Sequence, residues 1–234
     1  ALQNFAIIVA VMNRERLILL GSLLVLFTLM TGTLIWSQYF TSQEFFLAGT
    51  RPTFTEPEDL EPRLPPLRGT DPVRGSADPK AITIVEFADF TCEYCRLTYQ
   101  ELKKTFATTG IPIRFVWRSF PIKLEDPATL LTASAGYCAN QQQKFWEVYD
   151  RLFTMINPTR ESIVKLATEA KLEVNTFEQC LNGNAPLQAF QADRAIAKDH
   201  NITAAPTIFV GSNAFNGFVS ADELRQAINF AAQK

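Results

Sequence analysis

Residues 82–95 have the sequence Ile82-Thr83-Ile84-Val85-Glu86-Phe87-Ala88-Asp89-Phe90-Thr91-Cys92-Glu93-Tyr94-Cys95. The first half is mostly β-branched and apolar, which is typical of a buried strand. A short turn and two cysteines separated by two residues follow, and apolar residues then recur at helical spacing. We therefore expect a strand over Ile82–Phe87, a turn with the Cys-x-x-Cys pair, and a helix over Thr91–Thr108.

This arrangement predicts a redox-active dithiol. The sulfur of Cys92 is expected at the N-terminus of the helix, where unpaired backbone N–H groups and the helix dipole favour a thiolate. Cys95 follows about one turn later, close enough to form a disulfide with it. A zinc site is one alternative and an inert structural pair is another, but zinc needs four ligands. The other candidate ligands are far apart in the sequence: Cys138, Cys180 and His200. We therefore expect redox chemistry, with no metal and no cofactor.

The N-terminal part of the chain predicts a membrane anchor. Leu17–Trp36 is twenty residues without a charge, which as a helix spans about 30 Å, the thickness of the hydrocarbon core of a bilayer. Arg14 and Arg16 precede it, and no Lys or Arg follows until Arg51. The positive-inside rule then leaves residues 1–16 in the cytoplasm and the chain after Ser37 on the periplasmic or extracellular side. A cleaved signal peptide is the alternative, but its apolar region is normally shorter and no clear Ala-x-Ala site follows.

The 234 residues suffice for one domain plus an appendage, and the net charge of −2 gives no reason to expect a nucleic-acid partner. Residues 37–80 hold seven of the thirteen prolines and no sustained periodicity. They predict an extended, semi-stiff linker, with the folded domain at residues 81–234.

Within that domain, Ile113–Phe120 alternates apolar and polar residues and ends at Pro121, which indicates a second strand parallel to the first. Residues 127–201 are rich in Ala and Gln and predict four or five helices. A hairpin then follows, with strands at Thr207–Val210 and Ala214–Phe218, and Ser220 begins a last helix with a capping box. The expected fold class is α/β, with a helical block inserted between two halves of a sheet.

These features resemble the thioredoxin superfamily, and specifically its DsbA-like branch of secreted thiol oxidoreductases. The resemblance covers the chain from about Gly75 to the C-terminus. It rests on residues 84–95, on Arg114–Pro121, on Thr203-Ala204-Ala205-Pro206-Thr207, and on the segments Cys138–Gln141, Lys144–Trp146 and Phe177–Leu181 of the helical block. It implies a thioredoxin-like fold with an inserted α-helical domain.

The resemblance also implies catalytic roles. Cys92 would be the nucleophile and Cys95 the resolving cysteine, working by in-line thiol–disulfide exchange. Glu86 lies in the middle of the first strand among apolar neighbours, and a buried carboxyl of raised pKa there could take or return the proton of Cys95. The alternative for Glu86 is an ordinary residue that faces solvent.

Pro206 would be a cis-proline facing the dithiol, leaving the backbone of Ala205 free to pair with an extended substrate. A trans turn proline is the alternative. Glu93 and Tyr94 would contact substrate from between the cysteines. The best-known oxidase of this branch has Pro-His there, and Glu93 would raise the pKa of the Cys92 thiol and make the disulfide less oxidising. The direction of net electron transfer therefore stays open.

Cys138 and Cys180 are expected to form a structural disulfide between two helices, with two buried free thiols as the alternative. Closing a loop of about 43 residues would stabilise the fold by on the order of 4 kcal/mol on the chain-entropy model. His200 has no partner motif and is expected at the surface, near a helix end.

The expected function is that of an extracytoplasmic thiol–disulfide oxidoreductase that introduces disulfides into secreted, cysteine-containing polypeptides. The resemblance implies that a quinone-linked membrane partner of the DsbB or VKOR type reoxidises it. A reductase or isomerase is the nearest alternative. Isomerases of this superfamily are often dimers with a dedicated dimerisation region and none is evident here, so an isomerase is less favoured; the chain is expected to be a monomer. A metallochaperone or other binding module would need additional His or Met ligands.

Overall fold

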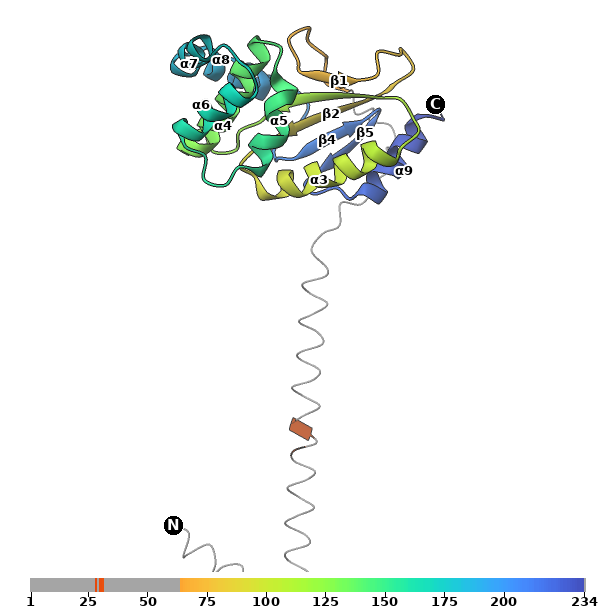
Figure 1. The fold of residues 1–234 in the computed structure, drawn as a ribbon. Coiled ribbons are helices and arrows are strands. Elements are labelled where there is room, and N and C mark those ends of the chain that lie inside the picture. Colours follow the sequence, from red (N-terminus) through yellow and green to blue (C-terminus); the bar gives the residue numbers. More distant parts are fainter. Residues whose placement is uncertain (1–27, 29, 32–63, 234) are drawn as a thin grey trace, which may run out of the picture. The chain divides into compact units, whose positions relative to one another are not determined.

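A computed structural model of the chain describes residues 28, 30–31 and 64–233 (Figure 1). Within residues 64–233 the protein has a five-stranded sheet and seven helices. Nearly all of the predicted membrane segment 17–36 and most of the predicted linker 37–80 lie outside the described residues. Among the residues that are described, no helix is both long enough and apolar enough to cross a bilayer.

The sheet is built from two chain segments on either side of the helical block. Its strand order is β1-β3-β2-β4-β5; β2 and β3 are parallel, and the other neighbouring pairs are antiparallel. A single helix, α3, connects the parallel pair β2 and β3. The strands and this helix are β1 (Val73–Gly75), β2 (Ile82–Ala88), α3 (Glu93–Thr108), β3 (Ile113–Ser119), β4 (Thr207–Val210) and β5 (Asn213–Asn216).

The folded domain begins earlier than residue 81, where the sequence had suggested that the linker ends. β1 pairs with β3, with Val73 opposite Val116, and Leu64 packs against the hydrophobic core. The indole Nε1 of Trp146 donates a hydrogen bond to the carbonyl oxygen of Val73 at 3.0 Å. A strand of three residues is too short to show an alternating pattern, so only its pairing with a distant strand reveals it.

One face of the sheet carries a cluster of aromatic rings that joins α3 and α5 (Phe145–Thr154) to β3. Phe90 stacks on Trp117 at 4.7 Å between ring centroids, and Tyr99 stacks on Phe153, also at 4.7 Å. Successive strand residues point to opposite faces, so Arg118 lies on the other face. There its guanidinium is buried and pairs with Asp71 and with Asp193 of α8 (Ala185–Asp199).

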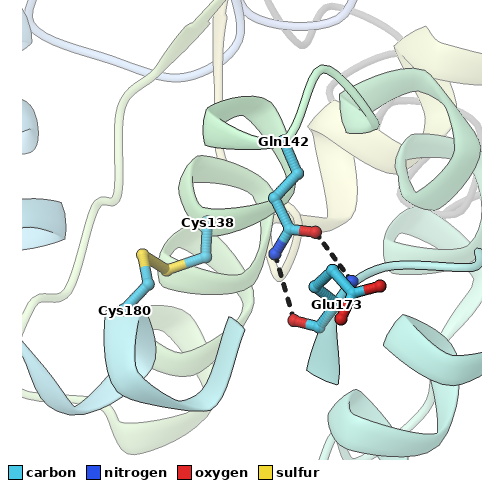
Figure 2. Close-up of a disulfide and its surroundings, with 4 residues drawn as sticks. All are labelled: Cys138, Gln142, Glu173 and Cys180. Atoms are coloured by element: carbon cyan, nitrogen blue, oxygen red, sulfur yellow. Dashed lines mark hydrogen bonds between the residues drawn. A yellow bond between two sulfur atoms is a disulfide. The ribbon is translucent and has the colours of Figure 1, made fainter. Parts of the chain in front are cut away.

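The predicted block at residues 127–201 contains five helices, gathered at one side of the sheet in Figure 1. Cys138 and Cys180 form a disulfide between α4 and α7, with their Cα atoms 5.8 Å apart. Beside it, the amide of Gln142 accepts a hydrogen bond from the Glu173 backbone N–H at 2.8 Å and donates one to the Glu173 carbonyl at 3.2 Å (Figure 2). The remaining helices of the block are α4 (Pro127–Gln141), α6 (Arg160–Glu169), α7 (Val174–Asn182) and α8 (Ala185–Asp199).

The hairpin after the helical block is tighter than the sequence suggested. Its turn is Gly211-Ser212, with Val210 opposite Asn213, and β5 ends at Asn216 instead of Phe218. Gly211 has a φ of +56°, a conformation that glycine adopts without steric cost and that a two-residue turn needs. The last helix, α9 (Ala221–Ala231), begins with the capping box of Ser220 and Glu223 predicted from the sequence.

Candidate functional site

Cys92 is the N-cap of α3, and its position explains why the two cysteines differ. Its backbone is extended, and its Sγ accepts a hydrogen bond from the backbone N–H of Cys95 at 3.3 Å. This N–H belongs to the first helical turn, whose amides have no partner inside the helix. Cys92 is partly exposed and Cys95 is fully buried, and both are free thiols. The strand–turn–helix arrangement therefore presents one sulfur to solvent and places the other behind it.

The environment separates the acidities of the two thiols. The side chain of Cys95 and the backbone N–H groups of Cys95 and Tyr94 lower the pKa of Cys92 by hydrogen bonding, against the opposing effects of burial and of Asp89. Burial raises the pKa of Cys95 far above its ordinary value, and its hydrogen bond to Cys92 adds to this. Cys92 therefore ionises first, and Cys95 retains its proton. Such an asymmetric pair has one nucleophile and one sulfur that stays protonated until it is needed.

Asp89, and not Glu93 as the sequence had suggested, is the carboxylate that opposes ionisation of Cys92. Glu93 is exposed, so solvent screens its charge. Asp89 is 4 % exposed. Its Oδ1 accepts hydrogen bonds from the backbone N–H and the hydroxyl of Thr91, both at 2.8 Å, and its Oδ2 accepts one from the Ile122 N–H at 2.9 Å. It thereby ties the turn that carries Cys92 to the loop after β3.

Pro206 lies beside the dithiol, at the start of β4. The Ala205–Pro206 peptide bond is cis, and the carbonyl oxygen of Ala205 lies 3.5 Å from the Sγ of Cys92. The Gly217 N–H donates to the Pro206 carbonyl at 2.8 Å, and the Thr207 hydroxyl donates to the Ala204 carbonyl at 2.7 Å. The fold thus brings Cys92, Ala205 and Pro206 together, although about 110 residues separate them in the chain.

Glu86 is fully buried in the middle of β2 and does not face solvent. The hydroxyl of Tyr149 donates a hydrogen bond to its Oε2 at 3.2 Å, whereas its Oε1 has no hydrogen-bond partner among the described residues. Burial raises the pKa of Glu86 to about 8; Tyr149 and Arg74 lower it in part, and negative charge on Cys92 raises it further. The charge of Glu86 in turn raises the pKa of Cys95. The carboxyl is therefore electrostatically coupled to both sulfurs.

The remaining predicted residues lie in α3, in the helical block and at the end of α8. Glu93 and Tyr94 are exposed in the first turn of α3, and the side chain of Tyr94 is 61 % exposed. The Cys138–Cys180 disulfide belongs to the helical block. His200 is the C-cap of α8, with its ring edge-on to Phe209.

Three residues that contribute to the electrostatics of the site were not predicted: Arg74, Asp89 and Tyr149. Asp89 could have been suspected, because it is an acidic residue at the end of a buried strand, three positions before Cys92. Tyr149 lies 63 positions from Glu86, and Arg74 falls in the segment taken for a linker. Nothing in the local sequence connects either of these two with the dithiol.

Comparison with known proteins places this geometry in context. A family model described as thioredoxin matches residues 68–229. The chain is similar to a thioredoxin-like oxidoreductase from Silicibacter pomeroyi DSS-3, with a TM-score of 0.62 and 24 % identity over 71 % of this chain and 95 % of that one. It is also similar to the thiol-disulfide exchange protein alpha-DsbA2 from Wolbachia pipientis, with a TM-score of 0.60 and 19 % identity over 69 % of this chain and 87 % of that one. At these identities the two structures show a shared fold.

A curated relative gives a different kind of match. The chain is 30 % identical over 169 residues to the Na(+)/H(+) antiporter NhaA 1 of Mycolicibacterium gilvum. The match covers 69 % of this chain but 27 % of that protein. The chain thus spans about a quarter of the length of this relative, and the likeness concerns one portion of it.

Proposed function

Because the chain belongs to the thioredoxin family, we propose that it is a thiol–disulfide oxidoreductase that introduces disulfides into secreted polypeptides through Cys92 and Cys95. The observation that carries the proposal is the N-cap position of Cys92, whose sulfur accepts the N–H of Cys95 and lies 3.5 Å from the Ala205 carbonyl oxygen. A partly exposed thiol of lowered pKa beside a buried one is the arrangement that dithiol exchange needs.

In this reaction the oxidised enzyme has a Cys92–Cys95 disulfide. A substrate thiolate attacks the Sγ of Cys92; a substrate–Cys92 bond forms, the Cys92–Cys95 bond breaks, and the electron pair leaves on Cys95. A second substrate thiolate then attacks the substrate sulfur of the mixed disulfide and releases Cys92 as a thiolate. The substrate loses two electrons as it gains its disulfide, and the enzyme dithiol receives them.

Glu86 would serve as the proton donor and acceptor for Cys95. A thiolate buried at Cys95 is unfavourable, which is why burial raises the pKa of this thiol so strongly. The pKa of Glu86, raised to about 8 by burial, keeps most of the carboxyl protonated at neutral pH, so that a proton is available when Cys95 leaves.

Substrate would bind across the surface around Cys92. Tyr94 and Leu97 of α3 are 61 % and 43 % exposed, and Phe218 is 37 % exposed. Phe218 directly follows Gly217, whose N–H donates a hydrogen bond to the Pro206 carbonyl. Exposed apolar side chains on the elements that carry Cys92 and follow the cis-proline turn suit an unfolded, extended polypeptide.

We further propose that residues 17–36 anchor the protein in the cell membrane, with the catalytic domain on the periplasmic or extracellular side. The charge asymmetry around this segment supports that orientation. The Cys138–Cys180 disulfide is compatible with it, because such bonds persist in oxidising compartments. A quinone-linked membrane partner of the DsbB or VKOR type would then reoxidise Cys92 and Cys95 in the monomeric enzyme.

A disulfide reductase is the second candidate, and Asp89 is the observation that favours it. Its buried negative charge opposes the Cys92 thiolate. A less stabilised thiolate makes the Cys92–Cys95 disulfide a weaker oxidant.

The reduction potential of the Cys92–Cys95 pair, equilibrated against glutathione, separates the two candidates. A potential well above that of glutathione, together with oxidation of a reduced unfolded protein by the full chain, supports the oxidase. A potential well below it would favour the reductase. If the full chain catalysed no thiol–disulfide exchange in either direction, the proposed function would be wrong.

A further inference from the structure

The Tyr149 side chain contacts Glu86 from outside the strand that carries it. Tyr149 belongs to α5 of the helical block, is fully buried, and directs its hydroxyl to the Oε2 of Glu86. Its ring is held edge-on by Trp117 at 5.3 Å and by Phe153 at 5.2 Å between centroids. A ring packed in this way has little freedom to swing its hydroxyl elsewhere. One carboxyl oxygen of Glu86 is therefore held, and the other is left without a partner.

Arg74 supplies a positive charge above the same ring. Its guanidinium carbon lies 5.1 Å from the ring centroid of Tyr149, 4.5 Å from that of Trp146 and 5.4 Å from that of Phe115. The arginine is half-buried in β1, directly opposite Phe115 of β3 in the strand register. A cation that is stacked on aromatic rings and partly withdrawn from water acts on a nearby buried carboxyl with little screening.

We propose that Tyr149 and Arg74 are positioning residues that hold Glu86 ready to exchange a proton with Cys95. This inference rests on the proposed dithiol function and extends it to two residues that do not touch the sulfurs. The groups that interact with Glu86 are Tyr149 from α5, Arg74 from β1, Cys92 at the N-cap of α3 and Cys95 in its first turn. Tyr149 and Arg74 stabilise the carboxylate, whereas burial and the sulfur charge oppose it. The balance keeps Glu86 able both to give and to take a proton near neutral pH.

The proton balance over one cycle follows directly. When substrate opens the disulfide, the Cys95 thiolate takes the proton of the Glu86 carboxyl, and the hydroxyl of Tyr149 and the charge of Arg74 stabilise the carboxylate that remains. Reoxidation begins when the Cys92 thiolate attacks the disulfide of a reoxidising partner and forms a mixed disulfide with it. The Cys95 sulfur then attacks Cys92, the Cys92–partner bond breaks with its electron pair leaving on the partner sulfur, and the Glu86 carboxylate takes the proton of Cys95. No further acid or base is consumed.

The first test is a titration of Glu86 in the reduced full chain, with glutamate labelled at the carboxyl carbon and observed by ¹³C NMR. The Glu86 signal is identified by its disappearance in Glu86→Gln. We expect a midpoint near pH 8 in the wild type, as burial implies, and a higher midpoint in both Tyr149→Phe and Arg74→Gln. Tyr99→Phe is the matched control, because Tyr99 lies in the same aromatic cluster but its hydroxyl donates a hydrogen bond to Asp150 and not to Glu86. This variant should keep the wild-type midpoint.

The second test is kinetic. The rate at which Cys95 resolves a preformed Cys92 mixed disulfide is measured against pH in four proteins. These are the wild type, Tyr149→Phe, Glu86→Gln and the double variant Tyr149→Phe/Glu86→Gln. If Glu86 is the base, a rise of one unit in its pKa slows resolution about tenfold at pH values below the midpoint. In the Glu86→Gln background, Tyr149→Phe should have no further effect.

Unchanged Glu86 midpoints in Tyr149→Phe and Arg74→Gln would overturn the inference. So would an equal slowing by Tyr149→Phe with and without Glu86, because that would indicate a packing role. These failures are distinguishable from failure of the proposed function. If the chain were inactive in exchange, the proposed function would be wrong but the Glu86 titration could still be measured. If the chain were active and the Glu86 midpoints did not change, only the positioning roles of Tyr149 and Arg74 would be wrong.

Discussion

The two cysteine pairs of this chain consist of the same atoms in two different environments. Cys92 and Cys95 are free thiols at the start of a helix, three positions apart, and one of them reaches solvent. Cys138 and Cys180 are joined across two helices, 42 positions apart. The groups around the first pair lower the pKa of Cys92 and raise that of Cys95, whereas the second pair closes a long loop. The location of a sulfur, and not its identity, decides whether it reacts or holds the fold together.

The hydrogen bonds around each pair express the same contrast. At Cys92 a backbone N–H is directed at the sulfur itself, which stabilises a reactive anion. Beside the Cys138–Cys180 bond, the Gln142 amide pairs with the backbone of Glu173, next to the first residue of α7 (Figure 2). Those bonds fasten α7 to α4 and leave the chemistry of the sulfurs unaffected.

Replacing Cys92 should have the largest effect. In Cys92→Ser the nucleophile is lost, so we expect exchange with a disulfide substrate to slow by more than about a hundredfold. The double variant Cys138→Ser/Cys180→Ser is the matched control and should keep its activity below its melting temperature. Equal losses in the two variants, measured by reduction of a chromogenic disulfide, would remove the distinction between the pairs.

Removing the second disulfide should instead lower the free energy of unfolding. For a loop closed over 42 positions, the chain-entropy model predicts a loss of on the order of 4 kcal/mol. Urea denaturation of Cys138→Ser/Cys180→Ser against the wild type measures it. Reduction of Cys92–Cys95 should give a much smaller change, since that loop is very short. A stability equal to that of the wild type would show that α7 is held by packing alone.

Glu86 should impose a pH dependence on stability. Burial raises its pKa to about 8, against an ordinary value of 4.5; between these values the folded state keeps a proton that the unfolded state releases. Stability should therefore fall as the pH rises from about 5 to 8, by at most about 1.4 kcal/mol per pH unit. Glu86→Gln lacks this contribution, so its free energy of unfolding should rise relative to that of the wild type across the same pH range. Parallel unfolding curves for the two proteins would show that Glu86 is not buried in its protonated form.

The smallest effect is expected at Gln142. Gln142→Ala removes two hydrogen bonds to the Glu173 backbone in a partly exposed position, which should cost about 1 kcal/mol. In the background without the Cys138–Cys180 disulfide the cost should change, because both contacts fasten the same helix. A double-mutant cycle of unfolding free energies tests this; strict additivity would mean that the two contacts act independently.

The amino-acid sequence by itself determined the elements whose signals are local. The apolar run of β2, the start of α3 at the Cys-x-x-Cys pair and the capping box of α9 each lie within a few residues. The burial of Glu86 followed from its apolar neighbours in one strand, for the same reason. Short-range periodicity and capping are encoded where they act, so they can be recognised without the fold.

Only the tertiary structure decided which groups surround the dithiol. β1 is a strand because β3 offers it a pairing edge, and its Arg74 reaches the aromatic cluster through that pairing. Tyr149 comes to Glu86 because rings of α5 pack on Phe115 and Trp117 of β3. Asp89 rather than Glu93 opposes the Cys92 charge because it is buried and Glu93 is not. The physical reason is common to all three. Burial and through-space distance set the strength of an electrostatic interaction, and neither can be obtained from positions along the chain.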